Sequence, residues 1–178
     1  HRKALMDLLS LSDDPRAKPA FIHAFKNYKP GDNDEEVKAA ARAVKKNKDQ
    51  FQGDNDLANA LLAGLKNTKF ANPRSGEIGA MLGDDISAIK AKGVVGELMG
   101  VVSAANDGLV TPQNQELTAR QVVAAQILGE IGDASIVPQL IDIMYDNAAK
   151  MPPHMENGVE VVKPSPLTTG VSMTVGNA

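Results

Sequence analysis

A short acidic motif, Gly-Asp-Asn-Asp, occurs twice, at residues 31–34 and 53–56. Aspartate and asparagine supply the hard oxygen ligands that Ca²⁺ prefers, but neither copy continues into the glycine and glutamate of an EF-hand loop. Both copies directly precede a predicted helix, where Asp and Asn side chains cap free N–H groups and oppose the helix dipole. Helix capping is therefore the favoured interpretation, with calcium binding as the alternative.

A second cluster brings soft ligands together, because Met151, His154 and Met155 lie close in sequence. Two thioethers and an imidazole suit Cu(I). The chain has no Cys and no second Met/His cluster nearby, so a Pro-rich loop with incidental methionines is the favoured interpretation. The chain has three His and no nucleophile paired with a base, so we expect no catalytic residues, no metal site and no cofactor.

A basic strip follows one predicted helix and the start of the next loop. Its members are Lys38, Arg42, Lys45, Lys46 and Lys48. A solvated helix face explains such a strip, and positive side chains near a helix C-terminus are favourable. The whole chain carries 19 basic and 22 acidic residues, a net charge of −3. That balance argues against a nucleic-acid partner.

The best-defined element of the chain is a helical hairpin predicted over residues 119–147. In each half, apolar residues recur at i, i+3, i+4 and i+7 or close to it, which places them on one helix face. They are Ala124, Ile127, Leu128 and Ile131 in the first half, and Val137, Leu140, Ile141 and Met144 in the second. Gly132 and Asp133 end the first helix and supply an acceptor for the second, and Pro138 falls early in the second helix.

A similar hairpin is predicted over residues 3–28. Its apolar positions are Leu5, Leu8 and Leu9 in the first helix, and Phe21, Ala24, Phe25 and Tyr28 in the second. Aligning Asp14 with Asp133 also aligns Pro19 with Pro138, at an offset of 119 residues. This offset equals three intervals of about 40 residues, which indicates an internal repeat.

Two less regular units are predicted between these hairpins. The first has helices over residues 35–46 and 56–67, and Asp54 lies 40 residues after Asp14. The second has a helix around residues 78–89, which we expect to be kinked or split because Gly79 and Gly83 lie within it. Its second helix is predicted over residues 94–105.

The composition favours closely packed helices over a β-sandwich. Hydrophobic residues make up 43% of the chain, but aromatic residues only 3%, and there is no Trp. No apolar run reaches the length of a transmembrane helix. The absence of Cys leans slightly towards an extracytoplasmic location, and the compartment stays open. The sequence begins with His1, so we expect a processed or trimmed chain, or a piece of a longer protein.

The motif A-A-x-x-L-G-x-I-G-D at residues 124–133, followed by Pro138 five residues after the Asp, resembles a HEAT repeat. The resemblance is clearest over residues 119–147 and 3–28. It implies an all-α fold, an α-solenoid (a HEAT/armadillo-like superhelix) of about four helical hairpins. We expect the repeat domain to span residues 1–149. Residues 150–178 contain Pro and Gly, and we expect them to form an irregular tail or a link to further repeats.

The resemblance and the lack of catalytic residues predict a non-enzymatic scaffold that binds a protein or peptide. Helical phase places polar residues of the second helices on the predicted binding surface. These are Lys18, Lys26, Asn59, Lys66, Gln139 and Asp142. The pattern is also similar to HEAT-like proteins related to phycobilisome lyases. The alternative function is therefore the handling of a chromophore or another ligand.

Overall fold

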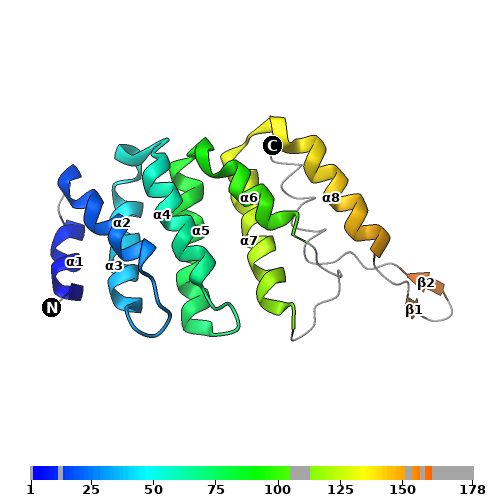
Figure 1. Cartoon of the computed structure of the whole chain (residues 1–178), viewed down its shortest axis with the longest axis horizontal. Helices are drawn as coiled ribbons and strands as arrows, with labels where there is room; N and C mark the ends of the chain where they lie inside the picture. Colours follow the sequence, from blue (N-terminus) through cyan, green and yellow to red (C-terminus); the bar gives the residue numbers. More distant parts are fainter. Residues whose placement is uncertain (1, 12–13, 105–112, 151–153, 157–158, 162–178) are drawn as a thin grey trace. The chain divides into compact units, whose positions relative to one another are not determined.

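The computed structural model describes residues 2–11, 14–104, 113–150, 154–156 and 159–161. In these residues α-helices alternate with short 3-10 helices (Figure 1). The α-helices are α1 (Arg2–Leu11), α2 (Lys18–Lys26), α3 (Asp34–Lys46), α4 (Asn55–Asn67), α5 (Pro73–Ile89), α6 (Val95–Val102), α7 (Gln115–Ile131) and α8 (Val137–Lys150). The 3-10 helices are η1 (Pro15–Ala17), η2 (Lys48–Phe51), η3 (Lys92–Val94) and η4 (Ala134–Ile136). Two short antiparallel strands follow, β1 (His154–Glu156) and β2 (Val159–Val161).

The predicted all-α class is confirmed by these eight α-helices of the described chain. The order α-helix, 3-10 helix, α-helix occurs four times, from α1–η1–α2 to α7–η4–α8. The chain forms two compact units, 1–95 and 96–178. This division falls inside the predicted 1–149 repeat domain, which stays a prediction. No helix in the described residues has the length and apolar character needed to cross a membrane.

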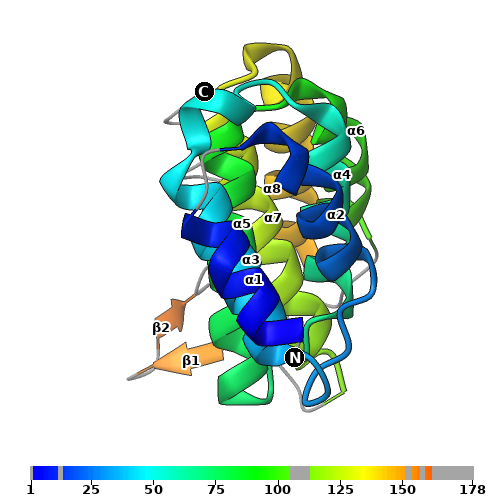
Figure 2. The same ribbon diagram turned by 90° about the vertical axis from the view of Figure 1, so that its left-hand side faces the viewer.

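The first unit is built from two layers of helices. In one layer α1, α3 and α5 lie side by side, and in the other α2 packs against α4 (Figures 1 and 2). The predicted stripe of the second helix is buried, including Phe21 and Phe25 at 1% and 0% exposure. The prediction for α1 was wrong in part: Leu8 is 66% exposed. Met6 is buried, because the face of α1 that packs on α3 lies about half a turn from Leu8.

The prediction of a solvated basic strip was wrong for Lys38, whereas Arg42, Lys45, Lys46 and Lys48 are exposed as predicted. Lys38 Nζ lies 2.7 Å from Glu77 Oε2, and Lys45 Nζ lies 3.8 Å from Asp84 Oδ2. The Lys38 side chain is only 12% exposed, so it is part of a helix–helix interface and not of a solvated face. Its hydrogen bond lowers the pKa of Glu77. Sequence periodicity missed this contact because the partner lies on another helix.

Helix α5 is one continuous helix of 17 residues, so the predicted break at its glycines does not occur. Gly79 is needed for packing: a Cβ atom there would lie 2.6 Å from Thr68 Cγ2 and 2.9 Å from Phe70 Cε1. The chain segment after α4 can therefore lie directly against α5. The conformational cost of a helical glycine is offset by this close approach.

The first unit also buries an acid inside α5. Asp85 is 1% exposed, and its Oδ2 accepts no hydrogen bond from any described residue. Burial raises the pKa of Asp85 to about 8, and the charge of Asp84 adds to this while Lys45 opposes it. The Asp85 carboxyl is therefore largely protonated at neutral pH.

In the second unit the predicted hairpin agrees with α7 and α8. Ala124, Ile127 and Leu128 are buried, and Gly132 ends α7 in the left-handed region at φ +70°. The prediction that Asp133 caps α8 was wrong. Its Oδ1 accepts the Ser135 amide at 3.0 Å, so Asp133 caps η4, because a 3-10 turn separates it from α8.

Candidate functional site

The structure places four of the six predicted surface residues in the first unit. Lys26 and Lys66 lie in the last turns of α2 and α4, and Asn59 is exposed on α4. Gln139 and Asp142 are exposed on α8, in the second unit. Of the first four, the structure brings only Lys26 and Lys66 to one hollow.

Lys18 has a structural contact that the sequence did not indicate. Its Nζ forms an ion pair with Asp54 Oδ2, and both side chains are largely buried. Asp54 also caps α4, because its Oδ1 accepts the Leu57 amide at 3.1 Å. Burial would raise the pKa of Asp54, but the hydrogen bonds from Lys18 and from the Leu57 amide lower it overall. Lys18 therefore ties the start of α2 to the start of α4.

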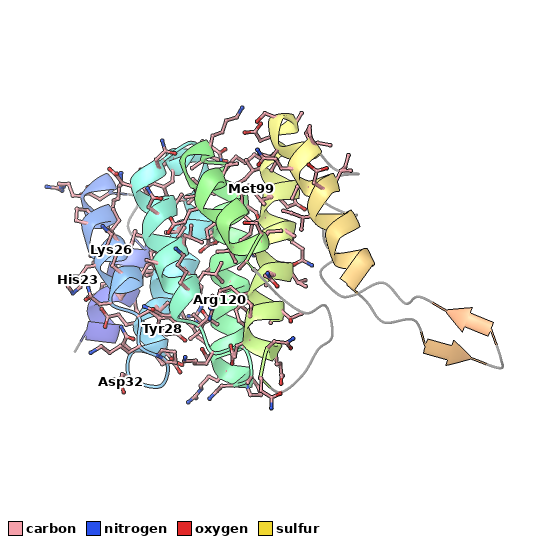
Figure 3. The ribbon with its side chains drawn as sticks, turned by 45° about the vertical axis from the view of Figure 1, so that its right-hand side comes forward. His23, Lys26, Tyr28, Asp32, Met99 and Arg120 are labelled. Atoms are coloured by element: carbon pink, nitrogen blue, oxygen red, sulfur yellow. The ribbon has the colours of Figure 1, made fainter. Side chains whose placement is uncertain are left out.

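The lysine hollow is an open depression of about 490 Å³ at the C-terminal ends of α2 and α4. Its polar lining comes from two short segments: Lys26, Asn27, Lys29, Lys66, Asn67 and Lys69. Tyr28 and Pro30 complete the lining. No acidic residue is among these lining residues. Figure 3 shows Lys26 on α2, with Tyr28 beyond the end of that helix.

Hydrogen bonds join the two segments that line the lysine hollow. Asn67 Nδ2 donates to the Tyr28 carbonyl oxygen at 3.2 Å. The Tyr28 hydroxyl lies 3.1 Å from Ser75 Oγ, which also accepts the Lys69 amide at 2.9 Å. Tyr28 and Ser75 are 1% and 2% exposed, and burial raises the pKa of Tyr28. A buried hydroxyl of α5 thus fixes the loop after α2 and the loop after α4 relative to each other.

The positive charge of the lysine hollow exceeds what the two helix ends require. Lys26 and Lys66 lie in last turns, where cations interact favourably with the helix dipole. Lys29 and Lys69 lie beyond the helix ends, and the dipole effect falls off within the last turn. Both of these side chains are exposed. This arrangement suits an anionic group placed between the two segments.

A second hollow of about 410 Å³ adjoins the first and has mixed charge. It shares Asn27 and Lys29 with the lysine hollow and adds His23, Asp32 and Glu36. His23 is on α2 and Asp32 lies in the following loop (Figure 3). The acidic side chains of the adjoining hollow lie on one side of Lys29, so the positive character is strongest between the two helix ends.

The sequence analysis missed Lys29, Lys69 and the two asparagines because they lie at helix ends or in loops, where hydrophobic periodicity gives no signal. A signal for them is nevertheless present. The pattern Lys-Asn-x-Lys occurs at residues 26–29 and again at residues 66–69, 40 residues later. A search for repeated polar patterns at the predicted repeat period would have found both copies.

The two acidic motifs have different roles. Asp54 of the second copy caps α4, as predicted. In the first copy Asn33 precedes α3 without a side-chain cap, and the Asp34 carboxylate accepts the Gly31 amide at 2.9 Å within the turn. The prediction of capping was wrong for this copy, because Gly31 lies three residues before the start of α3, one residue further from its helix than Gly53 lies from α4.

Two observations concern the candidate metal ligands. Among the residues it describes, no group of three His, Asp or Glu side chains is arranged to hold a metal ion. Of the predicted soft-ligand cluster, His154 and Met155 lie in β1, and Met151 lies outside the described residues.

No protein-family model, no curated protein and no solved structure matches the chain.

Proposed function

We propose that the chain is a HEAT-like α-solenoid segment that acts as a non-enzymatic scaffold and binds a protein or peptide. The observation that carries the proposal is a set of contacts between residues 39 apart. They join Lys38 to Glu77, Lys45 to Asp84, and Asn67 to Tyr28. Contacts at one constant separation are expected when similar units of about 40 residues stack on one another.

The turns at the two ends of the repeat region support the same proposal. Asp14 Oδ1 accepts the Arg16 amide at 2.9 Å, and Asp133 Oδ1 accepts the Ser135 amide at 3.0 Å. Each Asp directly precedes a 3-10 helix of three residues. The two aspartates are 119 residues apart, the offset of the predicted repeat. Asp54 does not share this geometry, because it follows η2 and caps α4.

Stacking of this kind explains why a binding surface would span two neighbouring repeats. Each repeat contacts its neighbours, and the second helices present an extended surface to a partner. The lysine hollow lies at such a position, since its two segments begin in the last turns of α2 and α4. Two neighbouring repeats therefore contribute similar residues to one binding site.

A peptide-display selection against the purified chain tests this function. We expect enrichment of related peptides that bind with micromolar dissociation constants in isothermal titration calorimetry, about −8 kcal/mol. Coexpression with a bilin tests the alternative function in parallel. Failure to enrich any peptide would contradict the scaffold proposal. Bilin absorbance in the purified protein would then favour a chromophore-handling protein.

A further inference from the structure

We infer that the lysine hollow binds an extended, acidic segment of a partner protein. This inference rests on the proposed scaffold function and names the chemistry of the partner. The site consists of Lys26 in the last turn of α2 with Lys29 after it, and Lys66 in the last turn of α4 with Lys69 after it, around a depression of about 490 Å³. Carboxylates of Asp or Glu side chains pair with the ammonium groups there.

Charge complementarity is the first argument. Lys26, Lys29 and Lys69 bring three ammonium groups to one depression, where they repel one another, and Lys66 adds a fourth positive charge to its lining. An acidic segment relieves this repulsion and is steered towards the hollow during association. The arrangement is local, and the chain as a whole carries a net charge of −3. A long polyanion such as a nucleic acid would also meet Asp32 and Glu36 of the adjoining hollow.

The spacing of the two segments is the second argument. Packed neighbouring helices such as α2 and α4 have axes about 8–10 Å apart. A peptide in the extended polyproline II conformation advances about 3.1 Å per residue with three residues per turn, so side chains three residues apart lie on one face and span about 9 Å. An acidic residue at position i and another at i+3 therefore match the lysines at the end of α2 and the lysines at the end of α4.

The shape of the hollow favours an extended segment over a single small anion. It is open to solvent, and the partly exposed Pro30 adds less polar lining. The lysine stems add apolar surface of their own. An extended peptide can cover this surface and place two carboxylates, whereas inorganic phosphate can occupy only one point of it.

The direct test measures binding of a twelve-residue peptide with Glu at every third position and Ser or Gly elsewhere. The full chain is titrated with this peptide in calorimetry at low salt, and with the matching peptide that has Gln in place of Glu. The double variant Lys29→Gln/Lys69→Gln removes two lining lysines that lie outside the helices. We expect at least tenfold weaker binding of the Glu peptide to this variant, and weaker binding to the wild type as salt rises.

The matched control is Lys48→Gln/Lys92→Gln. It removes the same charge from two exposed lysines of η2 and η3 that do not line the hollow. We expect this variant to bind the Glu peptide within about twofold of the wild type, and circular dichroism to show the same helix content for all three proteins. Equal weakening in both double variants would overturn the inference, because it would show attraction to net charge alone.

Further outcomes separate this inference from the proposed function. If display selection enriches peptides without acidic residues and Lys29→Gln/Lys69→Gln binds them normally, the scaffold function stands and the inference fails. If no peptide of either kind binds, both fail. Inorganic phosphate that binds at the hollow while the Glu peptide does not would identify a small-anion site and overturn the inference. A dimer in sedimentation that Lys29→Gln/Lys69→Gln abolishes would overturn it in favour of a second copy as the occupant.

Discussion

The two compact units of the chain differ sharply in charge. Residues 1–95 contain 16 of the basic residues and 13 of the acidic ones, a net charge of +3. Residues 96–178 contain 3 basic and 9 acidic residues, a net charge of −6. The lysine hollow belongs to the positive unit. A similar helical architecture therefore carries two surfaces of opposite character, and the overall charge of −3 conceals this difference.

One buried polar group from each unit gives a second comparison. The first unit buries Asp85, whose Oδ2 has no hydrogen-bond partner among the described residues. The second unit buries Gln121, whose Nε2 donates to the Val102 and Ala104 carbonyl oxygens at 3.2 and 2.8 Å. A buried polar group with partners stabilises a fold, whereas one without them destabilises it. The stability of the first unit should therefore depend on pH through Asp85. The stability of the second unit should depend on the hydrogen bonds of the neutral Gln121 side chain.

The largest expected effect comes from Asp85. Its folded-state pKa of about 8 lies above the ordinary value of 3.8, so the folded protein binds an extra proton between these two pH values. The free energy of unfolding should fall as pH rises from 4 to 8, by up to about 5 kcal/mol, and should change little below pH 4. Asp85→Asn should flatten this pH dependence. Urea unfolding at pH 5 and pH 8 measures it.

The neighbouring variant Asp84→Asn is the control for this experiment. The Asp84 side chain is 69% exposed, so its removal should shift the unfolding free energy by no more than about 1 kcal/mol at either pH. A wild-type protein with equal stability at pH 5 and pH 8 would show that Asp85 is not buried in its neutral form.

The next effect tests the second unit through Gln121. Gln121→Leu removes both donated hydrogen bonds and leaves two carbonyl oxygens at the end of α6 without this donor. We expect the free energy of unfolding to fall by about 2–3 kcal/mol, which hydrogen exchange should detect as faster exchange in α6 and α7. Gln126→Leu changes an exposed residue of the same helix and should have an effect within about 0.5 kcal/mol. Equal exchange rates in the two variants would refute the role of Gln121.

Glycines within helices provide a third contrast between the units. Gly79→Ala should destabilise the first unit by about 1–3 kcal/mol, because the new Cβ would lie 2.6 Å from Thr68 Cγ2. Gly100→Ala in α6 meets nothing within 4 Å and should stabilise the second unit by about 0.5–1 kcal/mol. Thermal unfolding measures both variants, and a stabilising effect of Gly79→Ala would show that the segment after α4 does not pack on α5.

The smallest effect concerns the left-handed residues that end α5 and α7. Lys90 ends α5 at φ +52°, a conformation that costs a side-chain-bearing residue about 1 kcal/mol. Gly132 ends α7 at φ +70° without this cost. Lys90→Gly should therefore raise the melting temperature by a few degrees, and Gly132→Ala should lower it by a similar amount. Changes of the same sign in both variants would contradict this assignment.

The sequence predicted the helices well because their burial follows one period. Ala124 and Leu128 in α7, like Leu57 and Leu61 in α4, lie at helical spacing and are buried. Asp85 lies seven residues after Ile78, and this helical spacing places both residues on the buried face of α5.

The lysine hollow was predicted only in part, through Lys26 and Lys66. These two residues lie on helices and so have a helical phase that can be read. Lys29 and Lys69 lie in loops, where no period relates one residue to the next. Only the packing of α2 against α4 brings the two loops together, and that contact is made by the buried faces of the two helices. Similarly, the pairing of Lys38 with Glu77 depends on the register between two helices.

Ser75 has a consequence for how such a surface can evolve. Its hydroxyl contacts the Tyr28 hydroxyl and the Lys69 amide from inside the helical layer, at 2% exposure. The distance between the two pairs of lysines is thus governed by a side chain that no partner touches. Substitutions around Ser75 can retune which spacing of negative charges is preferred while every lysine is retained. Selectivity and affinity of the surface can therefore change separately.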